Sequence, residues 1–411
     1  MSGALLVSVS AGHLAGPGSE AGRQVAQALL AQGLPVASRQ VVDEDEASVE
    51  AALRGAVAAY GLIVILATAA GSGGKIVRRV LARVTGTRLV LNERLLAALE
   101  AVHARRERPM PRRDDRLALL PQGAVLWSVE GGEPGWLLET ERSAVVVLPP
   151  TLATLPELLT RHLLPYAHER LGKEGVLVRT LRTVGLTPSE VEERIAPWLG
   201  GGEDVSVSCL PVEGEVWVRL SARATSLPLA EAALRDVEAP VVEALGADCY
   251  GRNQESLEGV VGRALQERRL TLSVAESCTG GLLGHRITNV PGSSAYFERG
   301  VVPYSNSAKE ELLGVSHQLL AAHGAVSGPV VEAMARGICR ASHTPLGLAI
   351  TGIAGPEGGT KAKPVGTVFV ALAHLGGVEA RRFLFSGGRE SIKWQSAQMA
   401  LDLLRRWLLR H

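Results

Sequence analysis

The sequence predicts a multidomain α/β protein, and three observations support this fold class. Strand and helix patterns alternate through residues 1–165, as they do in a doubly wound sheet. Residues 166–252 have a smaller α+β pattern, and residues 253–411 return to alternating strands and helices. The 411 residues are enough for about two or three domains with sizeable cores. We therefore expect three domains with boundaries at these positions.

The first domain should contain a parallel or mixed sheet with helices between its strands. Its expected strands are Ala4–Val9, Leu34–Val42, Leu62–Leu66, Gly123–Ser128 and Ala144–Leu148. Its expected helices are Glu20–Gln32, Glu44–Ala58, Ile76–Val84 and Asn92–Arg105. Ligands of such sheets bind at the carboxyl ends of the strands.

The glycine-bearing segment Ala69–Lys75, AAGSGGK, invites comparison with a phosphate-binding loop. Such a loop needs Ser or Thr directly after its lysine, and here Ile76 follows. We therefore interpret the segment as a turn between a strand and a helix. The basic runs Arg105–Arg108 and Arg112–Arg116 are interpreted as solvated loop charges.

The middle domain is expected to be a connector or dimerisation module, because it shows no catalytic cluster. Its expected strands are Leu177–Val184, Val205–Val212 and Glu215–Ala222, and its expected helices are Thr187–Ile195 and Leu229–Leu245. The segment SEVEE, preceded by Pro188, is a typical helix start.

The third domain, residues 253–411, has the most informative strand ends. Its expected strands are Leu270–Ala275, Phe297–Tyr304, Leu346–Thr351, Gly366–Ala373 and Ala380–Ser386. Its expected helices are Ser256–Arg268, Gly281–Thr288, Lys309–Leu313, Gly328–His343 and Arg389–Leu409. Pro329 near the start of the fourth helix is typical of a first helical turn.

Composition excludes several function classes. The formal net charge of +1 gives no electrostatic reason to expect nucleic acid or an anionic membrane as a partner. The four cysteines contain no CxxC pair, so neither a disulfide scaffold nor a zinc site is expected, and no metal or other cofactor is assigned. We see no basic-then-apolar leader and no run of roughly 18 apolar residues, so we expect a cytoplasmic protein.

Three strand ends in the third domain carry hydroxyl, amine or glycine groups that strand order can bring to one edge of a sheet. The first end supplies Ser277, Cys278 and Thr279, the second supplies Tyr304, Asn306 and Lys309, and the third supplies Thr351 with backbone amides. Ser293, Ser294 and Arg389 can join from adjacent loops. We expect a pocket at this edge.

These residue types favour a hydrolase. A serine hydroxyl is a poor nucleophile until a base takes its proton, and no histidine occurs in the three turns. Lys309 can act as that base if desolvation lowers its pKa, and Tyr304 can relay the proton or hold the lysine. The amides of the turn can form an oxyanion hole, and the following helix start favours an anion.

Each of these residues also has a purely structural interpretation. Ser277 can cap the helix after it, as hydroxyls in turns commonly do. Cys278 can be a small buried apolar residue, and Lys309 a solvated helix residue. Glu276 can orient a catalytic group or supply charge at the helix start.

The third domain resembles the C-terminal domain of the competence/damage-inducible CinA proteins, the nicotinamide-nucleotide amidohydrolase family. The stretches that carry the resemblance are AESCTGGLL (275–283), PGSSAYFERGVVPYSNSAK (291–309), HGAVS (323–327), TGIAGPEGG (351–359), KPVGTV (363–368) and FSGGRE (385–390). Two departures are Pro303, where family members usually have Thr or Ser, and Gly388, which replaces an acid. Neither removes an expected catalytic atom.

The resemblance implies a reaction and a set of roles. The family hydrolyses the carboxamide of nicotinamide mononucleotide to nicotinate mononucleotide and ammonia. Ser277 would be the nucleophile, with Lys309 and Tyr304 as its activating partners. Substrate contacts are expected from Thr279, Gly280, Ser294, Asn306, Thr351, Gly352 and Arg389.

Over its full length the chain resembles complete CinA proteins, which have a molybdopterin-binding-like first domain and a KH-like middle domain. The resemblance also suggests a homodimer. The family's first domain is linked to a metal-dependent ADP-ribose pyrophosphatase, but its acidic positions are Gly12, Lys75 and Ile76 here, with only Glu20 left nearby. Because hard cations need carboxylate oxygens, we expect a retained fold with a degenerate site.

Two other functions remain as alternatives at this point. The chain can be a nucleotide-binding or scaffolding protein without catalysis. It can also be bifunctional, with an active pyrophosphatase in its first domain, although the lost carboxylates disfavour this.

Overall fold

The computed structural model describes residues 3–10, 17–31, 34, 36–68, 72–105, 110–111, 114–129, 132–171, 175–202, 204–212 and 214–411. The chain forms two compact units, which are described separately. The second unit consists of Arg179–Gly202, Ser206–Leu220 and Asp236–His411, and the first contains the remaining segments. Among the described helices, none combines the length and the apolar character that crossing a bilayer requires.

The first unit contains the expected doubly wound sheet. Its strand order is β2-β1-β3-β8-β7-β6. The strands are β1 (Ala4–Val9), β2 (Val36–Val42), β3 (Leu62–Leu66), β6 (Val125–Trp127), β7 (Gly135–Glu139) and β8 (Ala144–Leu148). The first four strands in this order are parallel, and β7 pairs antiparallel with both of its neighbours. The strands β1, β3 and β8 are buried along their whole length, which explains why they consist mostly of Val, Leu and Ile.

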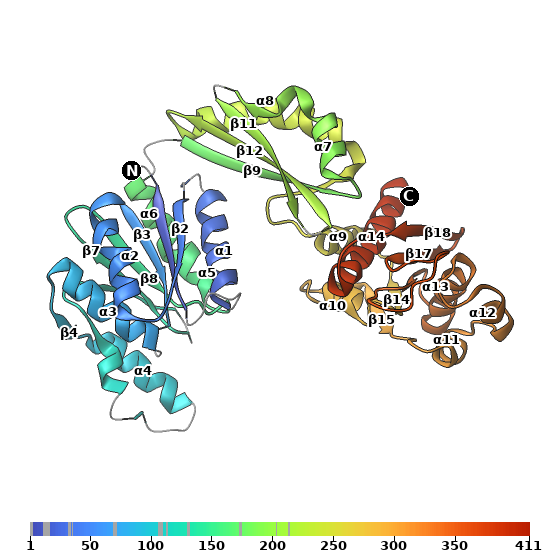
Figure 1. Cartoon of the computed structure of the whole chain (residues 1–411), viewed down its shortest axis with the longest axis horizontal. Coiled ribbons are helices and arrows are strands. Elements are labelled where there is room, and N and C mark those ends of the chain that lie inside the picture. Colours follow the sequence, from blue (N-terminus) through green and yellow to red (C-terminus); the bar gives the residue numbers. More distant parts are fainter. Residues whose placement is uncertain are drawn as a thin grey trace. The chain divides into compact units, whose positions relative to one another are not determined.

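Helices cover both faces of this sheet (Figure 1). They are α1 (Pro17–Ala31), α2 (Glu46–Ala59), α3 (Ser72–Thr85), α4 (Glu93–Arg105), α5 (Leu155–Leu158) and α6 (Leu164–Leu171). One core joins the sheet to α2 and α3, and the other joins it to α1, α5 and α6. A second, two-stranded antiparallel sheet of β4 (Leu89–Leu91) and β5 (Leu119–Pro121) lies next to α3. The short helix η1 (Asp114–Ala118) leads into β5.

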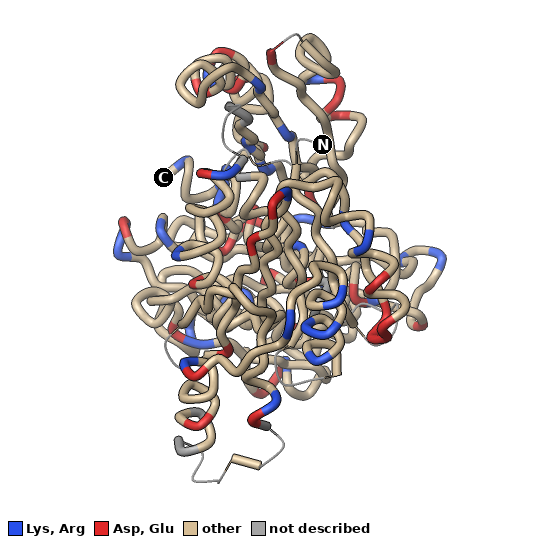
Figure 2. Tube along the Cα trace, turned by 90° about the vertical axis from the view of Figure 1, so that its left-hand side faces the viewer, with Lys and Arg blue, Asp and Glu red and all other residues tan. Residues whose placement is uncertain are grey.

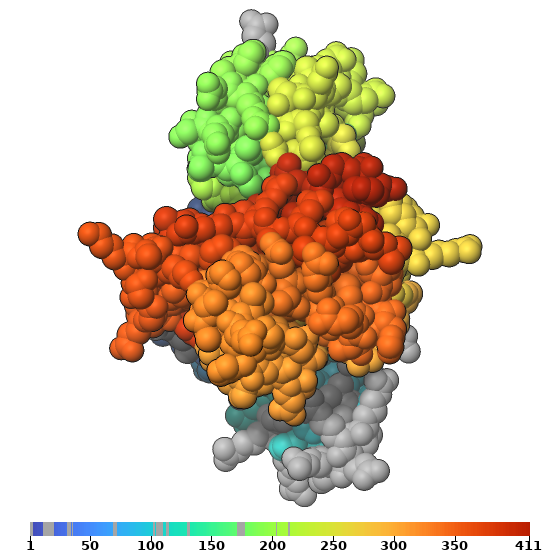
Figure 3. Space-filling model, turned by 90° about the vertical axis from the view of Figure 1, so that its right-hand side faces the viewer, coloured from blue at the N-terminus to red at the C-terminus, as the bar shows by residue number. Residues whose placement is uncertain are grey.

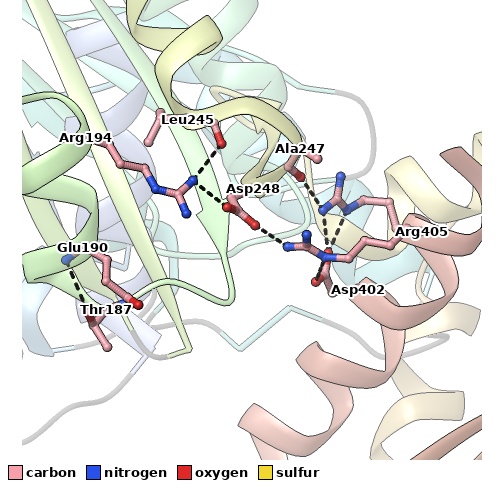
Figure 4. Close-up of polar contacts among 9 residues, drawn as sticks. Thr187, Glu190, Arg194, Leu245, Ala247, Asp248, Asp402 and Arg405 are labelled. Atoms are coloured by element: carbon pink, nitrogen blue, oxygen red, sulfur yellow. Dashed lines mark hydrogen bonds and ion pairs between the residues drawn. The ribbon is translucent and has the colours of Figure 1, made fainter. Parts of the chain in front are cut away.

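The middle sheet is the predicted α+β module. Its strand order is β10-β11-β12-β9-β13. The elements are β9 (Gly175–Val184), α7 (Pro188–Arg194), η3 (Ala196–Trp198), β10 (Gly200–Gly201), β11 (Val205–Val212), β12 (Glu215–Ala224), α8 (Leu227–Leu245), η4 (Gly246–Asp248) and β13 (Cys249–Arg252). Helix α7 begins with a capping box, in which the side chains of Thr187 and Glu190 each bond the backbone amide of the other (Figure 4).

The sheet of the C-terminal domain, called the third sheet below, carries the candidate site. Its strand order is β15-β14-β16-β17-β18. The strands are β14 (Leu272–Glu276), β15 (Phe297–Val301), β16 (Leu346–Gly352), β17 (Thr367–His374) and β18 (Gly377–Leu384). The helices are α9 (Leu257–Arg268), α10 (Leu282–Thr288), α11 (Asn306–Leu313), α12 (His317–His323), α13 (Gly328–Ser342) and α14 (Arg389–Arg410). The helices α9, α10 and α14 share one core with the sheet, and α11, α12 and α13 share the other.

Strand pairing explains where the site forms. The central strand β14 is parallel to both β15 and β16, so the carboxyl ends of three adjacent strands lie at one edge. Glu276 at the end of β14 is opposite Ile350 near the end of β16. Strand β15 ends at Val301, three residues before the predicted end at Tyr304, and the chain crosses the edge as a loop before α11 begins at Asn306.

The closing helix α14 is fixed to the end of α8 by a chain of ion pairs (Figure 4). Asp248 in η4 accepts hydrogen bonds from Arg194 on α7 and Arg406 on α14. Asp402 accepts from Arg405 and Arg406, and Arg405 also donates to the carbonyl of Ala247 at 2.7 Å. Because Asp402 and Arg405 are buried, breaking one partner would leave an unpaired buried charge.

Candidate active site

The catalytic serine predicted from the sequence lies in a tight turn after β14. Ser277 is 8% exposed, and its amide donates to the carbonyl of Ile350 at 3.0 Å. Gly280 and Gly281 follow with φ angles of +63° and +96°, a conformation that glycine adopts without a steric penalty. This double left-handed turn ends β14 abruptly and places Ser277 at the carboxyl edge of the sheet.

The start of α10 does not leave its amides free for a ligand, contrary to the expectation of an anion site there. The buried carboxylate of Glu276 accepts from the amides of Gly281, Leu283 and Gly284 at 3.1, 3.0 and 2.8 Å. The protein therefore supplies its own anion at this helix start. Of the two roles considered for Glu276, the structure shows the helix-start charge.

Lys309 lies in contact with the serine, although it comes from a helix 32 residues later in the chain. Its Nζ is 3.2 Å from Ser277 Oγ, 2.8 Å from the carbonyl of Pro303 and 3.2 Å from the carbonyl of Tyr304. The residue is 1% exposed, and burial lowers the pKa of its amine below the ordinary value of 10.5. No carboxylate within the described residues forms an ion pair with it, so its charged form has no partner anion there.

Helix α11 positions this amine. Ser305 caps the helix by accepting from the amide of Ala308 at 3.0 Å, and Lys309 stands one turn further along. The loop before the cap presents two successive carbonyls, those of Pro303 and Tyr304, to Nζ. The proline at 303, a departure from the family pattern, keeps the carbonyl that this contact needs.

Tyr304 contributes its backbone to the lysine and its side chain to a different group. Its side chain is 60% exposed, and its hydroxyl accepts from Arg389 Nη2 at 3.1 Å. Arg389, the first residue of α14, also donates from Nη1 to the carbonyl of Gly355 at 2.8 Å. The structure thus brings Tyr304 and Arg389 together at the rim of the site, and it shows no hydrogen bond from the tyrosine hydroxyl to Lys309 or Ser277.

Two residues expected to contact substrate are placed differently. Thr351 is buried, and its hydroxyl donates to the carbonyl of Ala325 at 2.9 Å, so it ties β16 to the loop before α13. Gly352 packs against the serine turn: a Cβ there would come within 3.0 Å of Cys278 Sγ and 2.6 Å of a Val368 methyl group. Both residues shape the site's wall in this structure.

The remaining expected contacts divide into buried and exposed positions. Thr279 is buried, and its hydroxyl has no hydrogen-bond partner among the described residues. Gly280, Ser294 and Asn306 are exposed and accessible to a ligand. Ser294 lies in η5 (Ser293–Ala295), next to the start of β15.

Cys278 is next to the serine but has the properties of a core residue. It belongs to the core that packs under α9, α10 and α14. Burial raises the pKa of its thiol to about 12, so the thiolate is not formed near neutral pH.

Residues 254–408 match the CinA C-terminal domain, and residues 178–251 match the damage-inducible protein CinA KH domain. A competence-damage inducible protein of Moorella thermoacetica is 40% identical over 383 residues, which is 92% of each chain. A CinA-like protein of Syntrophotalea carbinolica is 39% identical over 94% of this chain and 93% of its own. The chain belongs to the CinA family.

Solved structures include a CinA superfamily protein from Klebsiella pneumoniae. It is 35% identical, is covered over its whole length by 38% of this chain, and has a TM-score of 0.37. A molybdopterin biosynthesis protein from Mycobacterium abscessus is 16% identical over 42% of this chain and 96% of its own, with a TM-score of 0.28.

One basic residue of this CinA-family chain escaped the sequence analysis. Lys393 follows Arg389 by one helical turn on α14, so the two side chains lie on the same face. Its Nζ is 3.8 Å from the point where a Cβ on Gly280 would be, which places the amine beside the serine turn. Within the described residues it has no hydrogen-bond or ion-pair partner. The spacing of four from Arg389 was the available signal.

A second set of contacts connects α10, the helix after the serine turn, to α14 and β12. Arg286 on α10 donates to Gln398 Oε1 at 2.6 Å and lies over the ring of Trp394, 4.4 Å from its centroid. Gln398 Nε2 in turn donates to Glu215 at 2.7 Å. These buried contacts hold the helix that follows Ser277 in a fixed orientation.

The positions of the first unit at which the family resemblance predicts aspartates carry no acid in this chain. They are Lys75 and Ile76, and both lie in the first two turns of α3. Glu20 forms an ion pair with Arg23, and Gly12 lies outside the described residues. Among the described residues, no group of three or more His, Cys, Asp and Glu side chains is arranged to hold a metal ion.

Figure 3 shows one face of the second unit, which contains the candidate active site. The residues coloured orange to red, from α11 to the closing helix, make one continuous surface.

Proposed function

We propose that the C-terminal domain is an amidohydrolase that converts nicotinamide mononucleotide to nicotinate mononucleotide and ammonia. The observation that carries the proposal is the 3.2 Å contact between Lys309 Nζ and Ser277 Oγ at a buried strand edge. Membership of the CinA family and the resemblance of the site motifs support the choice of substrate.

The contacts of Lys309 can serve its neutral, basic form, which burial favours by lowering the pKa of the amine. An ammonium group has three N–H donors and no lone pair, whereas a neutral amine has two donors and one lone pair. The carbonyls of Pro303 and Tyr304 accept two N–H bonds, so the lone pair of the neutral amine is left for the hydroxyl proton of Ser277. A buried amine with two carbonyl acceptors and no carboxylate is suited to act as a general base.

The reaction then proceeds in two steps. Ser277 Oγ attacks the carboxamide carbon while Lys309 takes its proton, and the resulting tetrahedral intermediate releases ammonia after Lys309 returns the proton to the leaving nitrogen. The nicotinate ester of Ser277 remains. Water then attacks this ester with Lys309 again as base, releasing nicotinate mononucleotide and restoring the serine hydroxyl.

The serine turn offers a place for the negative charge of the intermediate. The amides of Cys278 and Thr279 follow Ser277 directly, and in the described part of the chain neither donates to an acceptor of another residue. We assign them to the oxyanion. Loss of one such donor costs about 10²–10³ in rate in other enzymes.

Arg389 and Lys393 provide the charge that a mononucleotide phosphate requires. Both lie on one face of α14 at its amino-terminal end, where backbone amides also favour an anion. We assign the phosphate to these two side chains, and Tyr304, held by Arg389, to the rim beside the pyridine ring. Exposed Asn306 and Ser294 are assigned to the ribose.

The test measures ammonia release from nicotinamide mononucleotide by the full-length protein. The wild type should turn over, Ser277→Ala should lose activity by about 10⁴-fold or more, and Cys278→Ala should keep it, because the thiol is buried and protonated. Loss of activity in Cys278→Ala together with a normal Ser277→Ala variant would overturn the assignment of the nucleophile.

The same assay separates the alternative of a nucleotide-binding protein without catalysis. Tight binding of nicotinamide mononucleotide in a calorimeter, with no ammonia released over many hours, supports that alternative and contradicts the proposed hydrolysis.

A further inference from the structure

The first unit contains a cleft that no proposed reaction uses. It has a volume of about 390 Å³ and is lined by Lys75, Arg78, Arg79, Leu89, Arg116 and Leu119. This volume lies within the range of small-molecule sites. Four of its six described lining residues are cations, and none is an acid.

Helix α3 supplies three of the four cations from one face. Lys75, Arg78 and Arg79 stand three and four positions apart, so their side chains project in the same direction. Arg116 reaches the cleft from η1, and Leu89 and Leu119 come from the paired strands β4 and β5. Helix α3, β4 and β5 pack against one another, so the cleft has a rigid floor.

Fold stability does not explain this arrangement. Cations near the amino-terminal end of a helix oppose the helix dipole, and like charges four positions apart repel, each effect being about 0.2–1 kcal/mol. Helix α3 has no acidic residue in its own first turn, although the Glu44 carboxylate lies at its start and accepts from Ser72 Oγ at 2.6 Å. A bound anion would relieve the repulsion among the cations of the cleft.

Arg78 is the buried member of the four cations that line the cleft. It is 3% exposed, and burial lowers the pKa of its guanidinium to about 10, with Glu133 acting in the opposite direction. The residue also lines a small cavity with Thr68, Pro134 and Pro149 at the carboxyl ends of β3 and β8. The guanidinium therefore connects the cleft to the edge where ligands of such sheets bind.

The positive charge of the cleft is only partly matched within the protein. Arg79 is paired with Glu46 at 2.7 Å, and Glu133 lies near Arg78. Lys75 and Arg116 have no ion pair or hydrogen bond among the described residues. Figure 2 shows acidic and basic positions interspersed over the described trace.

We propose that this cleft binds a diphosphate-bearing small molecule directly through cationic side chains, without a divalent metal. Two of the cations have no ion-pair partner among the described residues and two have an acidic neighbour, so the cleft suits an anion with two or more charges. The planar guanidinium groups suit paired phosphate oxygens. Leu89 and Leu119 provide an apolar wall for the organic part of the ligand. The lining cations repel a divalent metal, so the anion should bind without one.

The test uses the full-length protein in EDTA, with inorganic pyrophosphate as the probe in titration calorimetry. The wild type should bind, and Lys75→Glu and Arg116→Glu should each weaken binding by about 10-fold or more. Arg142→Glu is the matched control, because it makes the same charge change at an exposed loop position of the same unit, and it should bind as the wild type does. Lys393→Ala should also bind normally, which separates this cleft from the proposed phosphate site of the C-terminal domain.

Hydrogen exchange locates the binding independently of affinity. Pyrophosphate should slow amide exchange in residues 72–85 and 114–121 of the wild type, and this protection should disappear in Lys75→Glu. The proposal is overturned by absence of binding in EDTA, by binding that requires Mg²⁺, or by equal loss of affinity in Arg142→Glu. It is equally overturned if protection appears only in residues 276–284 and 386–396.

Discussion

A buried basic residue has opposite surroundings in the two units of this protein. In the second unit, Lys309 is buried against two carbonyls and a serine hydroxyl, and no carboxylate pairs with it among the described residues. In the first unit, Arg78 is equally buried but lies among other cations, with Glu133 nearby. The first arrangement favours loss of a proton, whereas the second retains charge and attracts an anion.

The difference follows from residue chemistry as much as from burial. A lysine amine loses its proton when it is desolvated, so burial creates a base. A guanidinium keeps its proton under the same conditions, so burial creates a fixed charge. A buried cation can therefore serve the proposed catalysis in one unit and the proposed metal-free anion binding in the other. The following predictions test this contrast, starting with the largest expected effect.

Replacing the amine should have the largest effect. Lys309→Met keeps the length and packing of the side chain but removes the base, and we expect kcat for ammonia release to fall by about 10³-fold. Lys309→Arg introduces a guanidinium group that keeps its proton, so this variant should be equally inactive. Lys361→Met, at an exposed position, is the control. Substantial activity in Lys309→Arg would contradict the role of a neutral amine.

The pH dependence of kcat should reveal the same group. Because only the neutral amine has a lone pair, kcat should rise about 10-fold per pH unit below the pKa of Lys309 and level off above it. Burial lowers that pKa, so the midpoint should lie below 10.5. Nearby, the thiol of Cys278 stays protonated across most of the accessible range, because burial raises its pKa to about 12. Saturating substrate avoids the titration of its own phosphate near pH 6.

A rate that falls as pH rises from about 5 to about 9 would contradict the predicted role, because the catalytic form would then be the protonated amine.

Lys393→Ala should affect substrate binding and leave the chemistry intact. Loss of one charged phosphate contact should raise KM for nicotinamide mononucleotide by about 10-fold. The phosphate-free nucleoside should show no change in kcat/KM, and Lys393→Arg should restore most of the affinity. Arg410→Ala removes a cation at the other end of the same helix and is the control. Equal losses with nucleotide and nucleoside would show that Lys393 acts on something other than the phosphate.

Gln398→Leu tests whether the contacts behind the serine turn matter. The substitution removes one of the acceptors of Arg286 and one of the donors to Glu215, so we expect a loss of about 1–2 kcal/mol in unfolding free energy. Because α10 follows Ser277, kcat should fall a few-fold while KM stays constant. Gln395→Leu, one turn earlier near an exposed strand end, serves for comparison. An unchanged melting temperature would show that these bonds contribute nothing net.

Much of the third sheet was predictable because its signals are local. Apolar runs defined β14 and β16, and hydroxyl and glycine residues marked their ends, so Ser277 and Lys309 were placed at one edge before the structure was known. Helix α12 was missed, as was β13 at the edge of the middle sheet, since both are short and lack a clear periodic pattern. The predicted end of β15 was three residues too late, because Val302 and Pro303 continue its apolar character into the loop.

The sequence could not show contacts between residues that lie far apart along the chain. Nothing in the order of residues indicated that Glu276 would occupy the amides of α10, or that Lys393 would approach Gly280. In the first unit, Arg116 reads as a loop charge until η1 brings it to the face of α3. Such groupings arise only when several elements pack together.

Thr351→Val should have the smallest effect, and it distinguishes a wall residue from a substrate contact. The hydroxyl of Thr351 donates to the carbonyl of Ala325, and valine keeps the shape while losing this bond. We expect a loss of about 1 kcal/mol in unfolding free energy with KM for nicotinamide mononucleotide unchanged. If KM instead rises about 10-fold while stability is unchanged, the hydroxyl turns toward the substrate, and the role implied by the family resemblance would replace the one seen in the structure.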